Sequence, residues 1–457
     1  MRPQELVERA LELLGPDRGT VVVENATTAN LRWANSTLTT NGMTAQQRVH
    51  IVAHPQVPGG IGSGTTSAVV RSVEELAELV RSARSEAHGA GPAQDVAPEV
   101  PARPASPGWD QAPTTSAPEE LAPVSTLLRD VLPASDVDHF GYAEHSVTTS
   151  FLATTGGLRL RHDQSAARFE LSGKSAGRSR SAWAGRSGRS FAELDLAGTP
   201  DEVRRGLAAQ ATRIDVAPGR QRVLLSPSAA ADLLIYLLWS AGARDAVEGR
   251  SAFSRPGGGT RVGDRLAALP VWIRSDPGAS GLECADHVQD TVSTGASSAF
   301  DAGLPRAATD WVSEGSLRAL GTTRHSAELA GIAHTPFVDN LLAGVEGRAG
   351  SLDELAARMG DGLLVTCLWY IREVDAQSLL LTGLTRDGVY VVRDGAVIGA
   401  AGNFRFNDSP LGMLGRITDA GDPGDCLPRE WADWFTRTRV APLVVDEFNL
   451  STTSEAV

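Results

Sequence analysis

The sequence predicts an α/β protein of the α+β type, in which mixed sheets and helices fill three successive segments. Short runs with strand-like alternation recur along most of the chain, and amphipathic stretches with helix-capping signals separate them. The length of 457 residues is enough for two or three domains that each bury a core.

The first segment, residues 1–86, is expected to form an N-terminal domain. An amphipathic helix over residues 1–14 precedes strand-like runs at 20–24, 30–34 and 48–53. A second helix is expected after Ser72, because Ser72 and Glu75 have the spacing of a capping box and apolar residues follow at helical spacing.

Residues 87–118 are rich in Ala, Pro, Gly and Ser, and we interpret them as a linker or flexible insertion. Residues 119–218 are expected to form a central domain. Alternating runs at 147–153, 158–162 and 168–171 favour an antiparallel sheet in this domain.

The central domain is expected to close with a helix. Thr199 is its predicted cap, Pro200 its first helical residue, and Glu202 completes a capping box. The Ser/Arg/Gly-rich stretch 172–190 shows no apolar period and is expected to be a mobile loop.

Residues 219–457 are expected to form the C-terminal domain. Its predicted elements are a strand at 221–225, an apolar helix at 228–241, a helix capped by Ser351 and Glu354, strands at 363–369 and 379–384, and a hairpin at 389–398 that turns at Asp394 and Gly395. No repeat of fixed period is visible.

The composition narrows the possible partners and the cellular location. Basic residues number 42 against 55 acidic ones, which gives a net charge of -13, so we expect no nucleic-acid partner. No apolar run approaches the ~20 residues of a membrane-spanning helix, and the N-terminus lacks the pattern of a signal peptide. We therefore expect a cytoplasmic protein without a membrane partner.

Several short patterns resemble functional motifs but give little evidence for the corresponding functions. The Gly-x-Ser-x-Gly pattern around Lys174 lacks the following helix of a nucleophile elbow. His50 and His54 lie in a predicted strand, which would hold them ~13 Å apart, too far to share an ion. His139 and His145 are expected at the surface of a loop.

Cysteines and one further histidine cluster bear on metal binding. The three cysteines are widely separated, so neither a disulfide framework nor a zinc ribbon is indicated. His325, Glu328 and His334 match no common zinc motif, and we retain them only as an alternative metal site.

The order of many short motifs resembles the TldD/PmbA family, and within it the TldE (PmbA) branch. The matching stretches are 31–36 (LRWANS), 40–42 (TNG), 60–64, 217–219 (APG), 223–227 (VLLSP), 251–253 (SAF), 263–266 (GDRL), 300–301 (FD), 362–366 (GLLVT), 393–397 (RDGAV) and 401–403 (AGN). The similarity spans most of the chain, excluding the 87–118 linker and about the last dozen residues.

The resemblance also locates a departure from the family pattern. In the TldD branch, a helix carries His-Glu-x-x-x-His, which binds zinc and supplies a catalytic base. Alignment places Ile235, Tyr236 and Ser240 at the three functional positions, and no His-Glu dipeptide occurs anywhere in the chain. The TldD branch also has a C-terminal cysteine near the metal. Cys426 lies in that region, but it precedes the expected closing strand at 438–445 by a long interval.

The resemblance therefore implies a TldE-like subunit without catalytic residues, cofactor or metal of its own. Zinc is expected in a TldD-type metalloprotease subunit, with which this chain would form a heterodimer that admits unfolded peptide for proteolysis. Two alternatives remain open. The chain could be a metallopeptidase active by itself, or a homo-oligomeric peptide-binding protein.

Overall fold

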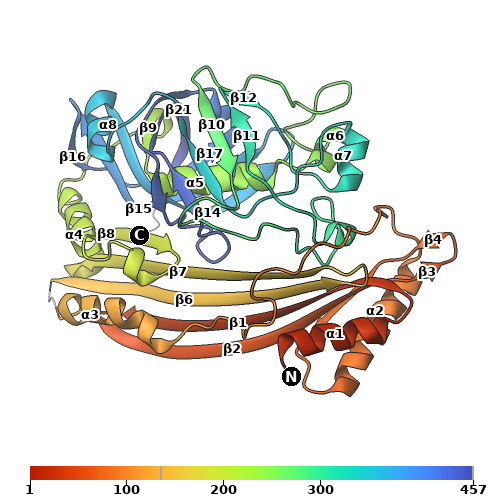
Figure 1. Ribbon diagram of the computed structural model, residues 1–457. Helices are drawn as coiled ribbons and strands as arrows, with labels where there is room; N and C mark the ends of the chain where they lie inside the picture. The colour runs from red at the N-terminus through yellow and green to blue at the C-terminus, as the bar shows by residue number, and fades with distance from the viewer. Residues whose placement is uncertain (134–135, 455–457) are drawn as a thin grey trace.

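The computed structural model describes residues 1–133 and 136–454, and it contains three large sheets with helices packed around them (Figure 1). The predicted α+β class is confirmed. No helix in the described ranges is long and apolar enough to cross a membrane.

The first sheet is long, curved and antiparallel (Figure 1), with the strand order β5-β2-β1-β6-β7-β8. Its strands are β1 (Arg18–Ala34), β2 (Thr37–His54), β5 (Gly64–Ala68), β6 (Val137–Thr154), β7 (Arg159–Ser175) and β8 (Ser181–Gly188). A small hairpin, β3 (Gln56–Val57) and β4 (Gly60–Ile61), lies outside it. Strands from both the predicted N-terminal and the predicted central domain therefore lie in one sheet.

Amphipathic helices bury their apolar faces against this sheet. α1 (Pro3–Leu14) and α2 (Val73–Ala90) enclose one core with β1 and β2, and α3 (Ala122–Val131) contributes to a second. Ser72 caps α2 by accepting a hydrogen bond of 3.2 Å from the amide of Glu75. The carboxylate of Glu75 accepts from the amide of Arg71 instead of that of Ser72, so the predicted capping box is only half formed.

The segment at 87–118 begins as the last turn of α2 and then packs against the first sheet. Trp109 is buried against Phe151, with ring centroids 5.6 Å apart. The side chain of Gln4 donates a hydrogen bond of 2.7 Å to the carbonyl of Trp109. The short helix η1 (Pro118–Leu121) leads from this segment into α3.

Two predictions for residues 172–209 are wrong. The stretch 172–190 is the end of β7, the short helix η2 (Ala176–Arg178) and strand β8, followed by η3 (Phe191–Glu193). Small residues, such as Ala182 and Ala184, fill the buried positions of β8, so the usual large apolar side chains are missing from the pattern. α4 (Thr199–Ala209) has Gly198 as its N-cap, and Thr199 already lies inside the helix.

The C-terminal part contains the other two large sheets. The second has the order β12-β11-β10-β13-β20-β19 and comprises β10 (Val271–Ser275), β11 (Thr309–Ser313), β12 (Ser316–Leu317), β13 (Leu341–Val345), β19 (Gly424–Cys426) and β20 (Thr438–Val440). The third has the order β14-β9-β21-β17-β15-β16, with β18 paired to β21. Its strands are β9 (Gly219–Leu225), β14 (Gly362–Asp375), β15 (Leu380–Arg393), β16 (Ala396–Ala400), β17 (Asn403–Asp408), β18 (Ile417–Ala420) and β21 (Leu443–Ser454).

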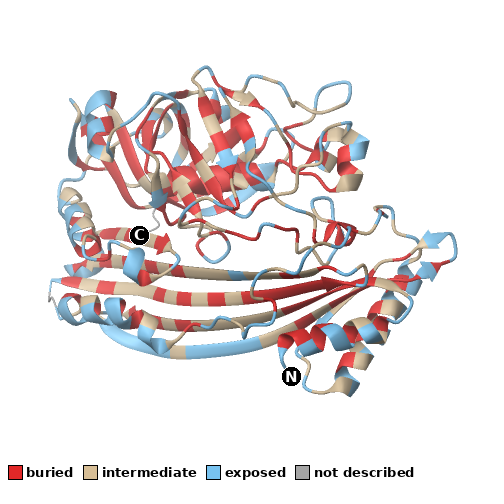
Figure 2. Cartoon of the chain, viewed as in Figure 1, coloured by how far each residue is buried: buried red, intermediate tan, exposed pale blue. Residues whose placement is uncertain are grey.

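The predicted apolar helix is α5 (Pro227–Trp239), and it lies between the second and third sheets, in contact with β19 and β20 on one side and β9 and β14 on the other. Apolar side chains surround most of its circumference, as expected of a buried helix. Figure 2 shows it as a largely buried element. The smaller helices are α6 (Ala243–Val247), η4 (Ala299–Asp301), α7 (Arg324–Ala330), α8 (Leu352–Met359) and α9 (Pro410–Leu414).

The first sheet and the C-terminal part contact each other through β8, which lies against β15 and β19. The hydroxyl of Ser187 on β8 donates a hydrogen bond of 3.0 Å to the carbonyl of Cys426 on β19. Farther along the sheet, the ring of His54 stacks on Phe300 at 4.1 Å. These contacts position the helix α5 and its surroundings over the first sheet.

Candidate functional site

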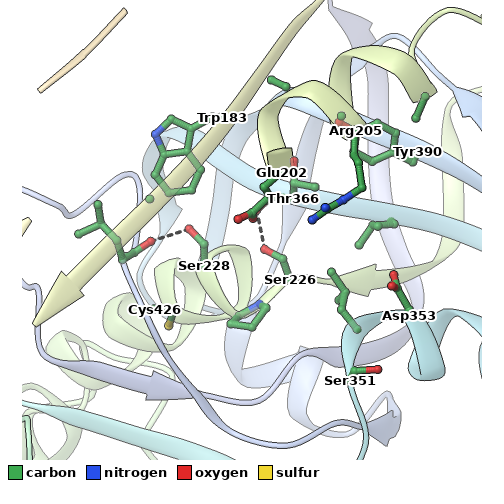
Figure 3. Close-up of a pocket in the computed structure, with 18 of the residues that line it drawn as sticks. Trp183, Glu202, Arg205, Ser226, Ser228, Ser351, Asp353, Thr366, Tyr390 and Cys426 are labelled. Carbon is green, nitrogen blue, oxygen red and sulfur yellow. Dashed lines mark hydrogen bonds between the residues drawn. The ribbon is translucent and has the colours of Figure 1, made fainter. Parts of the chain in front are cut away.

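A cavity of about 590 Å³ lies where β8 and α4 meet the C-terminal part (Figure 3). Trp183 of β8 and Glu202 and Arg205 of α4 border it from one side. Ser226, Ser228, Thr366, Tyr390, Asp353 and Cys426 line it from the C-terminal part. The cavity thus exists only because the two parts of the chain are joined.

The N-terminus of α5 opens into this cavity. Ser226 is the N-cap, because its hydroxyl oxygen accepts a hydrogen bond of 3.2 Å from the amide of Ala229. The same hydroxyl donates to the carbonyl of Thr366 at 2.5 Å, and that of Ser228 donates to the carbonyl of Leu427 at 2.7 Å. A helix N-terminus carries partial positive charge, so this end of α5 adds to the polar character of the cavity wall.

Charged side chains of both signs stand around the cavity. Arg186 pairs with Glu202 at 2.6 Å, while Arg205, Asp353 and Asp425 also contribute to its lining. Tyr390 is buried at the cavity wall, and burial raises the pKa of its hydroxyl to about 12. The phenol is therefore a neutral hydrogen-bonding group at physiological pH.

Asp232 is a fully buried carboxyl group on α5. Its Oδ1 accepts a hydrogen bond of 3.1 Å from the amide of Glu430, whereas its Oδ2 has no partner among the described residues. Burial raises the pKa of Asp232 well above its ordinary value. The raised pKa favours the neutral acid, in which form the group avoids the cost of burying a charge.

Arg429 is buried beside Asp232 and connects the two parts of the chain. Its guanidinium contacts the carboxylate of Asp387 and lies 3.0 Å from the sulfur of Cys367. It also lies between the rings of Trp183 and Trp369, at 5.1 and 5.4 Å from their centroids. Burial alone would raise the pKa of Asp387, but the charge of Arg429 and the hydrogen bonds from Ser181 and Arg429 together lower that pKa below its ordinary value.

The positions aligned with the zinc motif are packing positions. Ile235 is fully buried in the core, and Tyr236 is half-buried with its ring 5.8 Å from that of Trp431. The hydroxyl of Ser240 donates a hydrogen bond of 2.8 Å to the carbonyl of Tyr236. These three side chains offer neither imidazole nor carboxylate, so this helix does not fit a zinc ion bound in the TldD manner.

Cys426 is closer to α5 than its sequence position indicated. β19 pairs with β20 so that Cys426 lies opposite Thr438, and α5 packs on both strands. Its sulfur is 3.3 Å from the hydroxyl of Thr438, and burial raises the pKa of the thiol to about 12. The sequence did not predict that Cys426 lies near α5, because an 11-residue loop separates β19 from β20. Cys367 is similarly buried, and its pKa is raised to about 11.

The alternative metal residues do not converge on a site. His325 and Glu328 lie on α7, whereas His334 follows it and approaches Asp301 at 3.7 Å. Asp301 is itself engaged by Arg324 at 2.6 Å. In the described parts of the chain, no three His, Cys, Asp or Glu residues are arranged to hold a metal ion.

The remaining residues considered as functional candidates are parts of strands β6 and β7 and form no functional motif there. Lys174 and Ser175 end β7, and η2 rather than an α-helix follows, so no nucleophile elbow forms. His139 and His145 lie on β6 and are buried, which corrects their predicted surface location. Residues around the two histidines alternate between buried and half-buried positions along β6, and both histidines occupy buried positions.

Comparison with known proteins places this architecture in a metallopeptidase-like class. Residues 218–452 match the model of the PmbA/TldA metallopeptidase C-terminal domain. The chain belongs to the TldD/PmbA family, because this match covers more than half of it. No functionally curated protein matches the sequence.

Solved structures share the fold over almost the full length. TldE from Thermococcus kodakarensis has 13% identity and a TM-score of 0.77, covering 98% of this chain and 99% of its own. A candidate modulator of DNA gyrase from Thermotoga maritima has 15% identity and a TM-score of 0.76, with coverage of 98% and 99%. A second such candidate, from Bacteroides thetaiotaomicron, has 11% identity and a TM-score of 0.74, with coverage of 98% of both chains.

Proposed function

We propose that the chain is a TldE-like subunit that binds no zinc and works with a TldD-type metalloprotease subunit. The observation that carries the proposal is the packing of Ile235, Tyr236 and Ser240 at the positions of the zinc motif. Burying an aliphatic side chain such as that of Ile235 is favourable by ~1.5 to 3 kcal/mol, so the helix here is a core element.

The proposed contribution of this chain is assembly and the binding of unfolded peptide. The cavity beside Trp183 has the mixture that peptide binding requires: an aromatic side chain, hydroxyl groups and charges of both signs. An extended peptide would also find main-chain groups at sheet edges with which to pair. Zinc and the base for water activation would come from the TldD-type subunit.

Reconstitution tests this proposal. The chain and the TldD-type chain of the same organism are purified separately, mixed, and analysed by native mass spectrometry and by cleavage of an unstructured peptide. We expect a heteromeric complex and cleavage by the mixture at a rate well above that of either chain. Absence of a complex, with cleavage independent of this chain, would contradict the proposal.

The cavity is tested in the same mixture. Trp183→Ala removes the largest aromatic surface of the cavity, and we expect a higher KM for peptide with the complex still formed. Ile398→Ala, at an exposed position of β16, is the matched control. An unchanged KM for the Trp183 variant would exclude the cavity as a peptide site.

A further inference from the structure

Among the described residues, Arg205 of α4 lines the cavity without a carboxylate partner. Figure 3 shows its guanidinium extending from α4 into the cavity, toward the N-terminal end of α5. Glu202, one turn earlier on the same helix, pairs with Arg186 at 2.6 Å, and the neighbouring Arg204 pairs with Asp201 at 2.9 Å. Arg205 forms no ion pair within residues 1–133 and 136–454. The cavity therefore holds a positive charge that the described chain does not balance.

The carboxylates at the cavity wall are already balanced by other groups. Asp425 pairs with Arg439 at 2.6 Å. Asp353 is the second residue of α8, where the partial positive charge of a helix N-terminus stabilises a carboxylate. Because Glu202 is paired as well, an anion that enters the cavity meets Arg205 as a free cation.

Two hydrogen-bond donors complete the surroundings that a carboxylate needs. The hydroxyl of Tyr390 lies against Gly206, the residue after Arg205, because a Cβ at Gly206 would be only 2.7 Å from that oxygen. This hydroxyl accepts a hydrogen bond of 3.4 Å from Gln210 and donates to no acceptor in the described parts of the chain. The amide of Ser228 is the second of α5 and has no intrahelical partner. Tyr390 and Ser228 line the same cavity as Arg205.

Apolar surface lies beside these polar groups. Trp183, Leu364 and Leu427 line the cavity together with the hydroxyl groups. The volume of about 590 Å³ is within the range of ~300–1,000 Å³ of small-ligand sites. A cavity of this size takes the end of a peptide rather than a long extended stretch.

We propose that the cavity binds the C-terminal end of a peptide. The terminal carboxylate would pair with Arg205, since a guanidinium binds a carboxylate through two parallel hydrogen bonds. Tyr390 and the amide of Ser228 would donate further hydrogen bonds to it, and the last side chain would pack on Trp183. A small free carboxylate offers the same charge but leaves the apolar wall uncovered. The inference rests on the proposed function, because it names the part of the peptide substrate that the cavity takes.

Isothermal titration calorimetry on the full chain tests the inference. The probes are two N-acetylated pentapeptides with uncharged side chains and a final leucine, one with a free C-terminal acid and one with a C-terminal amide. We expect the acid to bind about tenfold more tightly, because only the acid makes charge-assisted hydrogen bonds with Arg205. Arg205→Gln should abolish this preference. Arg204→Gln changes the neighbouring arginine, which does not line the cavity, and as the matched control it should retain the preference.

Three results of the titration would overturn the inference. Equal affinity of the wild type for the acid and the amide, or no binding of either, would show that the carboxylate is not recognised. A preference that persists in Arg205→Gln would place the carboxylate elsewhere. Acetate that binds as tightly as the peptide acid would identify a site for small carboxylates instead of peptide ends.

Reconstitution with the TldD-type chain separates this inference from the proposed function. Arg205→Gln should still form the complex, as judged by native mass spectrometry. It should raise the KM for the peptide acid about tenfold and leave that for the amide unchanged. Equal KM values for the two peptides in the wild-type mixture, with the complex formed and both peptides cleaved, would overturn the inference alone. A mixture that forms no complex and cleaves independently of this chain would contradict the proposed function itself.

Discussion

The backbone amide of Glu430 donates a hydrogen bond of 3.1 Å to Oδ1 of Asp232. The indole of Trp431 donates to the backbone carbonyl of the same aspartate at 2.9 Å. These two contacts hold the loop between β19 and β20 against α5. The aromatic contact between Trp431 and Tyr236 then covers one of the positions at which the proposed alignment places the zinc motif.

Asp232→Asn tests whether the buried carboxyl group is neutral. Because burial raises the pKa of Asp232 above that of the unfolded chain, the folded state binds more protons than the unfolded state above pH ~4. The wild type should therefore lose stability as pH rises from about 4, and Asp232→Asn should remove this part of the pH dependence.

Urea unfolding at pH 4 and pH 7 measures the effect. The asparagine variant should gain stability relative to wild type on going from pH 4 to pH 7. Asp232→Ala is the control, and it should be destabilised by ~1–3 kcal/mol at both values because the amide of Glu430 loses its acceptor. An identical pH dependence for wild type and Asp232→Asn would show that the carboxyl group is ionised.

Arg429→Met tests the buried ionic contact between Arg429 and Asp387 within the C-terminal part. It leaves Asp387 with a longer contact of 3.6 Å to Arg386 and a hydrogen bond from Ser181, but without its close charge partner, so we expect a loss of ~3 kcal/mol in unfolding free energy. Asp387→Asn in the same chain should recover part of this loss. Arg372→Met, which removes a more exposed pair with Glu430, should cost no more than ~1 kcal/mol. Additive effects of the Arg429 and Asp387 changes would contradict the coupling.

Restoring the zinc motif tests whether α5 has become a packing element. The triple change Ile235→His, Tyr236→Glu and Ser240→His introduces the TldD-type residues. We expect no stoichiometric zinc by metal analysis. A lower melting temperature is also expected, since burying an unpaired imidazole at Ile235 costs ~1–3 kcal/mol. Ile235→Val is the control for packing alone. One zinc per chain with unchanged stability would show that the site is intact except for its ligands.

His54 is expected to limit stability in acid. Burial lowers its pKa to about 4, so the unfolded chain takes up a proton below pH ~6.5 that the folded chain does not. Stability should fall between pH 6.5 and 4, and His54→Phe should reduce this fall by up to about 3 kcal/mol. Urea unfolding across this range measures the difference, and equal slopes for the two proteins would contradict the assignment.

The sequence predicted those elements whose patterns are local. α5 and the hairpin turning at Asp394 were expected from apolar periodicity and turn residues, and both are present. The full length of β1 and β2 was not predicted, because the polar middle of β1 is half-buried, that of β2 is exposed, and neither shows a buried face. β8 was missed for a related reason, since its buried side chains are small.

The surroundings of α5 depend on contacts between distant residues. The family resemblance predicts that Ile235, Tyr236 and Ser240 occupy the zinc-motif positions, but it could not show that Cys426 returns to α5 through the pairing of β19 with β20. The cavity was not predictable either, because Trp183 and Ser228 are brought together only when β8 packs on the C-terminal part.

The most direct test of the account is zinc-dependent cleavage by this chain with and without a TldD-type chain from the same organism. Zinc content and cleavage of an unstructured peptide are measured for each chain, for the mixture, and for a mixture whose TldD-type chain carries glutamine in place of the motif glutamate. We predict no zinc and no cleavage for this chain alone, cleavage by the wild-type mixture, and loss of cleavage with the complex intact in the glutamine mixture. Zinc-dependent cleavage by this chain alone would contradict the account.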